Sequence, residues 1–223
     1  MQQMRLESLL VNGKKFLLNS VIHLDAQFNQ LKCLCAQHLP THLVRLNVDN
    51  NRLMSLDLSA CEDLTYISAR RNQLEELTSS HIPLSASCIL MEDNYFNKVQ
   101  LIDACPSLLT LTVNLYLYNS CLDLSGASRL TRLSLFAPSS ISPTVILPAS
   151  LLSLKMDFRH PASIIMMDAI SALPHLRYLE AEHDAFTFTD AFRLPISLRF
   201  FIPSQYVSHA LAPVTVQRKC CHQ

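Results

Sequence analysis

The sequence predicts a repeat solenoid of α/β type, in which every repeat adds one short strand to a parallel sheet. The first observation is a pattern of apolar residues and asparagine, Leu-x-x-Leu-x-Leu-x-x-Asn-x-Leu, which fits the segment from Leu43 to Leu53 and starts again at Leu64. The second is its period, because successive starts lie 21 to 25 residues apart. The starts are Val21, Leu43, Leu64, Ala86, Leu108, Leu130, Leu151, Leu176 and Leu198.

Each start leads into an apolar-x-apolar core, such as Leu46 and Val48, which is typical of a short strand with alternate side chains turned inward. One such turn cannot bury its apolar residues alone, whereas stacked turns form a continuous core. A second apolar segment recurs later in the period, as in Leu56 and Leu58. Two apolar ribs per turn are therefore expected.

The asparagine of the pattern is expected to be buried, because a side-chain amide can both donate to and accept from loop backbone that the stacked turns remove from water. Four successive repeats keep it, as Asn29, Asn51, Asn72 and Asn94. Other residues fill the later slots, which predicts a less regular C-terminal half. They are Tyr116, Pro138, Arg159, Asp184 and Tyr206.

The repeats divide the chain into three parts. Residues 21–207 are expected to form the solenoid, with about nine repeats. Residues 1–20 are expected to form an N-terminal cap, because the open end of a solenoid must be shielded from water. Residues 208–223 are assigned to a C-terminal tail or partial cap.

These repeats resemble the leucine-rich-repeat family over residues 21 to 206. The stretch from Leu43 to Leu77 looks like short bacterial, internalin-type repeats, and the Leu-Pro-x-x-Leu segments look like those of secreted bacterial effectors. Phe28-Asn29 and Phe96-Asn97 are similar to the FNIP subtype, so the subtype stays open. The resemblance implies a right-handed coil with a parallel, concave β-sheet and a mostly irregular convex side.

Composition excludes several functional classes. The 18 basic residues balance the 18 acidic ones, so no net field attracts nucleic acid, and no nucleic-acid partner is expected. With two glycines in the chain, Gly-rich phosphate loops are excluded. No apolar run reaches the length of a transmembrane segment, and no export signal is recognisable. We therefore expect a cytoplasmic protein, or one delivered into a host cytosol, with free thiols at its cysteines.

Candidate chemistry is sparse, and no catalytic, cofactor or metal site is predicted. Cys33-x-Cys35-x-x-His38 has the residue types of a metal site, but no second pair follows at a zinc-like spacing. Cys61-Glu-Asp63 resembles the catalytic Cys-x-Asp of effector ubiquitin ligases, yet Cys61 fills a recurring apolar slot. Lipidation at Cys220 or Cys221 is not expected, because the penultimate residue is histidine.

Side chains beside the buried core residues of each strand should point outward, so the repeat register alone predicts the columns of the concave face. These columns mix charges of both signs with aromatic residues, a combination suited to protein recognition. The predicted partner-binding residues are Arg45, Asn47, Asp49, Tyr66, Arg70, Glu92, Arg132, Tyr178 and Glu180.

Two functions remain open at this point. The first is a non-catalytic protein-protein interaction module, an effector or adaptor, that binds its partner on the concave face. The alternative is the substrate-recognition arm of a ubiquitin-ligase-type effector that lacks its catalytic domain. A purely structural or decaying repeat protein is a third possibility, which the loss of the asparagine slot leaves open.

Overall fold

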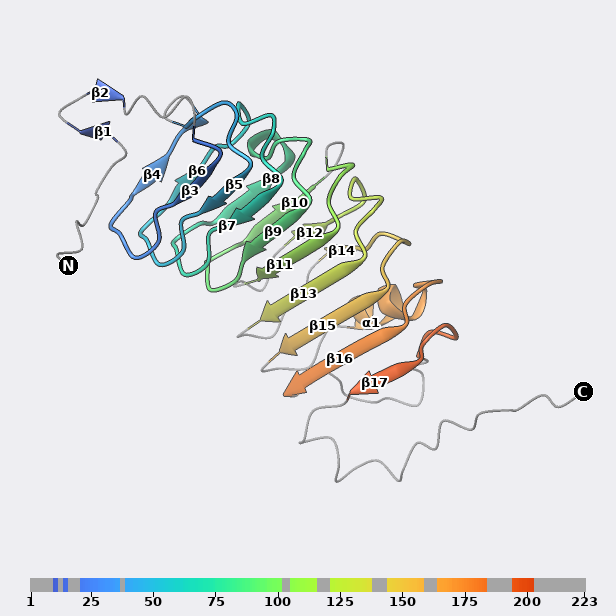
Figure 1. The fold of residues 1–223 in the computed structure, drawn as a ribbon. Coiled ribbons are helices and arrows are strands. Elements are labelled where there is room, and N and C mark those ends of the chain that lie inside the picture. Colours follow the sequence, from blue (N-terminus) through green and yellow to red (C-terminus); the bar gives the residue numbers. More distant parts are fainter. Residues whose placement is uncertain are drawn as a thin grey trace, which may run out of the picture.

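The computed structural model describes residues 10–11, 14–15, 21–36, 39–101, 105–115, 121–137, 144–158, 164–183 and 194–202. Within these ranges a nine-stranded parallel sheet runs the length of the molecule, and its strands follow one another in chain order (Figure 1). The strands are β3 (His23–Asp25), β5 (Arg45–Asn47), β7 (Tyr66–Ser68), β9 (Cys88–Met91), β11 (Thr110–Asn114), β13 (Arg132–Ala137), β15 (Ser153–Phe158), β16 (Tyr178–His183) and β17 (Phe200–Ile202).

The other side of each turn contributes shorter strands, which form a pair, β4–β6, and a four-stranded parallel sheet, β8–β10–β12–β14. Their bounds are β4 (Cys33–Leu34), β6 (Ser55–Leu56), β8 (Glu76–Thr78), β10 (Lys98–Gln100), β12 (Cys121–Asp123) and β14 (Thr144–Ile146). The remaining described elements are the antiparallel strands β1 (Leu10–Val11) and β2 (Lys14–Lys15), a 3-10 helix (Ser79–His81) and α1 (Ile164–Ser171), which contacts β14.

The predicted fold class is confirmed, because the chain forms a parallel-sheet β-solenoid with few helices. The second apolar rib is confirmed as well, since Leu58 and Leu124 are fully buried behind the nine-stranded sheet. The side of the solenoid opposite the nine-stranded sheet was expected to be mostly irregular. In the described part of the chain it carries six short strands joined by irregular segments. It therefore holds more regular hydrogen bonding than the sequence indicated.

The core lies between the two sides and is filled by the middle residues of the strands. Leu46, Ile67 and Ile89 have no exposed surface. Their counterparts in the first and last strands, Leu24 and Phe201, are only partly buried. This gradient is expected of a solenoid, in which a terminal turn has a neighbour on one side.

Three of the four predicted asparagines, Asn51, Asn72 and Asn94, are buried and connect successive turns, whereas Asn29 in the first repeat is only partly buried. The Asn72 amide nitrogen donates to the carbonyl oxygens of Val48, Ala69 and Arg70 at 3.0, 3.1 and 3.1 Å, and its side-chain oxygen accepts from the Leu53 N–H at 2.9 Å. Asn51 and Asn94 make the same set of bonds one turn before and one turn after. The later slots, from Tyr116 onward, lie outside the described residues.

The turn that presents each asparagine needs a left-handed backbone residue immediately before it. Phe28, Asn50, Arg71 and Asp93 adopt φ values of 57°, 56°, 53° and 59°. Glycine takes this conformation without steric cost, and asparagine or aspartate takes it more readily than arginine or phenylalanine does. These turns are therefore formed without glycine, and the packing of the stacked repeats must hold the less favourable residues in place.

The predicted N-terminal cap lies outside the described residues except for β1 and β2, and so does the predicted C-terminal tail with Cys220 and Cys221. In the ranges that are described, no helix has the length and apolar character needed to cross a membrane.

Candidate functional site

The solvent-facing side of the nine-stranded sheet, called the sheet face below, displays the predicted columns in the predicted register. Strand pairing aligns Arg45 with Tyr66 and Asn47 with Ser68. The full first column reads His23, Arg45, Tyr66, Cys88, Thr110, Arg132, Ser153, Tyr178 and Phe200. The repeat alone was therefore sufficient to place these positions beside one another.

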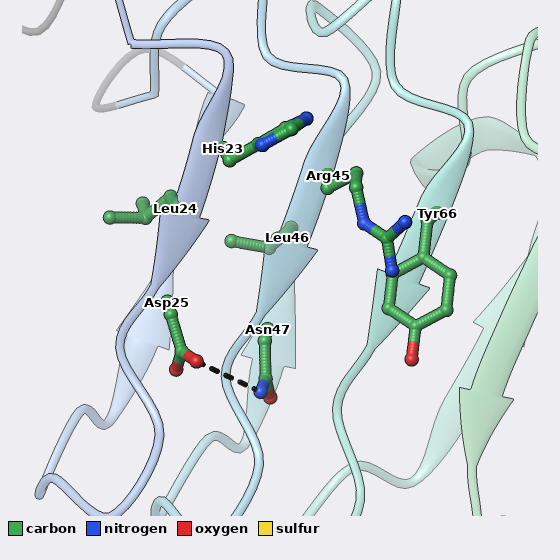
Figure 2. A pocket seen from close by; sticks show the side chains of 7 residues that line it. All are labelled: His23, Leu24, Asp25, Arg45, Leu46, Asn47 and Tyr66. Carbon is green, nitrogen blue, oxygen red and sulfur yellow. Dashed lines mark hydrogen bonds between the residues drawn. The ribbon is translucent and has the colours of Figure 1, made fainter.

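A hollow of about 270 Å³ opens on the sheet face over β3, β5 and β7 (Figure 2). It is lined by His23, Leu24, Asp25, Arg45, Leu46, Asn47 and Tyr66. Three of these, Arg45, Asn47 and Tyr66, belong to the predicted site. His23 and Asp25 were missed as site residues, although the first strand places them in the same two columns.

Arg45 and Tyr66 form the upstream rim of the hollow, at the N-terminal ends of strands β5 and β7. The guanidinium carbon of Arg45 lies 4.4 Å from the centroid of the Tyr66 ring, within the range of a cation–π contact. Figure 2 shows the guanidinium against the Tyr66 ring, with His23 on the strand next to that of Arg45. The ring restricts the long arginine side chain, which lowers the entropy that Arg45 would lose on binding a partner.

The downstream rim is formed by Asp25 and Asn47. The Asn47 amide donates to Asp25 at 3.4 Å, and Gln27 donates to the same carboxylate through its backbone N–H and its side-chain amide at 3.2 and 3.1 Å. The Asn47 side-chain oxygen accepts from the Asp49 N–H at 3.1 Å. The hollow thus has a cationic upstream rim and an anionic downstream rim.

Next to the hollow, Asp49 is more buried than the sequence predicted. Asp49 is only 9% exposed. Its carboxylate accepts from the Ser68 hydroxyl at 2.7 Å and from the Arg70 backbone N–H at 2.8 Å. Alternation along the strand also turns Ser68 outward, in the column of Asn47, but Ser68 is 1% exposed. Both side chains fill the space between neighbouring strands where they satisfy each other. Asp49 is therefore a positioning residue for β7 rather than an open contact.

Arg70 and Glu92 extend this network across the sheet face. The Arg70 Nε lies 2.7 Å from Glu92 Oε1, and the Thr112 hydroxyl donates to Glu92 Oε2 at 2.5 Å. Burial by itself lowers the pKa of Arg70, but the hydrogen bond and charge of Glu92 outweigh it, so the pKa is raised. The guanidinium is held charged and in a fixed position, with part of its surface open to solvent.

The three remaining predicted residues lie toward the C-terminal end. Glu180 accepts from Lys155 at 3.0 Å and from the Tyr178 hydroxyl at 2.9 Å, and the hydrogen bond to Glu180 raises the pKa of Tyr178. Arg132 is exposed on β13, two strands from β16. The predicted site is therefore divided into an N-terminal group, from Arg45 to Glu92, and a separate C-terminal group.

Asn114 is a second correction to the outward columns. The repeat register places Asn114 in the outward column of Asp49, Arg70 and Glu92, yet it is 5% exposed. Its side-chain oxygen accepts from the Asn94 N–H at 2.8 Å, and its amide donates to the Asn94 carbonyl. Strand β11 continues to Asn114, two residues further relative to its start than β5 and β7 do. The amide continues the buried asparagine ladder from the next strand.

A second hollow, of about 330 Å³, lies on the back between β6 and β8, which are not hydrogen-bonded to each other. Its lining includes the acidic residues Asp57, Glu75 and Glu76. Within the described ranges no three His, Cys, Asp or Glu side chains are grouped so that they could hold a metal ion. His38, the third residue of the Cys33 motif, lies outside those ranges.

The cysteines of the core are poor nucleophiles. Cys61 is 1% exposed and Cys105 is fully buried. Burial raises the pKa of each thiol to about 11, and the Asp57 carboxylate contributes to the shift at Cys61. Both thiols are protonated at neutral pH, which is the less reactive state. This agrees with Cys61 as a residue of the apolar rib.

Comparison with known proteins gives little further information. No family model matches the chain, and no curated protein matches it. A solved structure that does match is the functional domain of InlJ from Listeria monocytogenes, described as including a cysteine ladder. The two share 15% identity with a TM-score of 0.28, and the match covers 83% of this chain and 58% of that one. The sheet face therefore has to be interpreted from its own geometry.

Proposed function

We propose that this chain is a non-catalytic recognition module that binds a protein partner on its sheet face. The observation that carries the proposal is the N-terminal group, in which a hollow rimmed by Arg45 and Tyr66 adjoins the fixed network of Arg70 and Glu92. Arginine and tyrosine are the residue types enriched among the energetically dominant contacts of protein interfaces. These side chains stand on short strands that buried asparagines connect to one another. The loss of conformational entropy on binding is therefore small.

The same surface serves the alternative in which the chain is the substrate-recognition arm of a ubiquitin-ligase-type effector. Both functions require binding at the sheet face, and they differ in what the bound partner undergoes afterwards. The first measurement is therefore the same for both, namely which surface the partner contacts.

We also propose a reducing compartment, the cytoplasm or a host cytosol, as the place of action. The cysteines in the described residues are free, and two of them, Cys61 and Cys105, belong to the apolar core. Unpaired thiols are typical of proteins kept under cytosolic redox conditions.

The test begins with affinity capture and mass spectrometry to identify a partner, followed by titration of that partner against variants. Tyr66→Ala and Arg70→Ala should each weaken binding by at least about 1 kcal/mol, roughly fivefold. Glu62→Ala is the matched control, because Glu62 is exposed in the turn before β7 and away from the sheet face. If Glu62→Ala weakens binding while Tyr66→Ala and Arg70→Ala do not, the sheet face is not the binding surface.

A further inference from the structure

The cations of the sheet face differ in how they are neutralised. Arg70 lies against Glu92, with Asp49 at 4.0 Å, and Lys155 lies against Glu180. Arg45 contacts an aromatic ring instead, and in the described part of the chain no carboxylate forms an ion pair with it. Asp25 lines the same hollow, but its carboxylate is used by Gln27 and Asn47.

The stacking of Arg45 leaves its hydrogen-bonding capacity open. A guanidinium has five N–H donors that all lie in its plane, whereas a cation–π contact uses the face of that plane. Tyr66 contacts the arginine, and within the described residues the Arg45 guanidinium donates no hydrogen bond. Guanidinium donors in this fork arrangement match the two oxygens of a carboxylate. In Figure 2 the guanidinium lies on the Tyr66 side of β5, against the ring.

We propose that this hollow receives an acidic side chain of the protein partner, whose carboxylate pairs with Arg45. The inference rests on the proposed function and adds the chemistry of the partner segment. Asp25 on the opposite rim repels further negative charge, so the hollow suits a ligand with a single negative charge. A phosphate would place a larger negative charge near that carboxylate.

The hollow has the shape of an open depression rather than an enclosed pocket. Its volume is about 270 Å³, at the small end of ligand-binding pockets. It is also open to the sheet face, over three adjacent strands. An extended partner segment can therefore lie across the strands and insert one side chain.

In the experiment the whole chain is titrated with short peptides of alternating glycine and glutamate, acetylated and amidated at their ends. NMR monitors the arginine side-chain N–H signals and the ring signals of Tyr66. The same peptide with glutamine in place of glutamate is the neutral probe. We expect the glutamate peptide to shift the Arg45 and Tyr66 signals, and the glutamine peptide to bind about tenfold more weakly. Equal binding of the two peptides would overturn the proposal.

Variants separate a specific site from general attraction to positive charge. Arg45→Gln should abolish the shifts at Tyr66, and Arg45→Lys should restore only part of the affinity because lysine lacks the planar fork. Arg129→Gln is the control, since Arg129 is exposed in the turn before β13, lies outside the predicted site and makes no ring contact in the described residues. Equal losses from Arg45→Gln and Arg129→Gln would reduce the effect to net charge and contradict the proposal.

A further peptide without glutamate but with a free C-terminal carboxylate tests the source of the carboxylate. If only this peptide binds, the hollow captures a chain end and the assignment to an acidic side chain is wrong. Failure here is distinguishable from failure of the proposed function. A partner sensitive to Tyr66→Ala but insensitive to glutamate-to-glutamine changes in its own chain would refute the carboxylate inference and leave sheet-face binding standing.

Discussion

The side-chain oxygen of Asn72 accepts a hydrogen bond from the backbone N–H of Leu53 at 2.9 Å, across 19 residues of chain. The same amide donates to Val48 in the preceding turn and to Ala69 in its own. One buried side chain thus satisfies backbone groups of two turns, from which water is excluded. The stability of the solenoid depends on such ties as well as on its apolar core.

We predict that Asn72→Ala lowers the free energy of unfolding by about 1–3 kcal/mol, because it leaves buried backbone groups without partners. Gln73→Ala is the control, since Gln73 is the exposed neighbour in the same turn, and it should change stability by less than about 0.5 kcal/mol. Urea denaturation of the two variants decides the matter. Equal midpoints would mean that the Asn72 bonds contribute nothing.

Arg71 provides a second prediction, because its φ of 53° is unfavourable for a non-glycine residue. Arg71→Gly should be neutral or stabilising, since relief of about 1–2 kcal/mol of steric cost offsets the greater freedom of glycine in the unfolded chain. The lost contact with Asp93 is an exposed ion pair and contributes little. Arg52→Gly, at an exposed arginine without a positive φ, should destabilise by about 0.5–1 kcal/mol. Thermal unfolding that ranks the two variants in the opposite order would contradict the strain argument.

Thiol labelling should distinguish surface from core. In the native protein at pH 8, iodoacetamide should modify the exposed Cys33 and leave Cys61 and Cys105 unmodified, as read by peptide mass spectrometry. After denaturation without reductant, all eight cysteines should react. Fewer than about six reactive thiols would contradict the cytosolic assignment.

The raised thiol pKa values also predict how stability depends on pH. In the unfolded chain the thiols of Cys61 and Cys105 ionise near 9.0, whereas in the fold they keep their protons until about 11. Between these values the unfolded state binds fewer protons, so stability falls as pH rises. The double variant Cys61→Ala/Cys105→Ala should be less stable overall but should show a shallower fall from pH 9 to 11. An unchanged slope in urea titrations would show that these thiols are not responsible.

The sequence predicted the columns of the sheet face because a strict repeat fixes register: once Leu46 and Ile67 are aligned, Arg45 must lie beside Tyr66. It also predicted the burial of Asn72, whose slot recurs. Alternation failed for Asp49 and Asn114, because side chains near the ends of strands can turn between neighbouring turns when a buried partner satisfies them. The hollow and the stacking of Arg45 depend on rotamers, which the repeat does not specify.

The parallel register has a consequence for how the chain folds. Paired strands of the large sheet are 21 to 25 residues apart. The loop that must close to pair two strands therefore has nearly the same length at every turn. Loop-closure entropy grows slowly with length, and each added turn therefore meets a similar barrier. Since a turn contacts its immediate neighbours, no distant strand has to be found first. Folding can nucleate where Asn51, Asn72 and Asn94 tie adjacent turns together and then propagate toward either end.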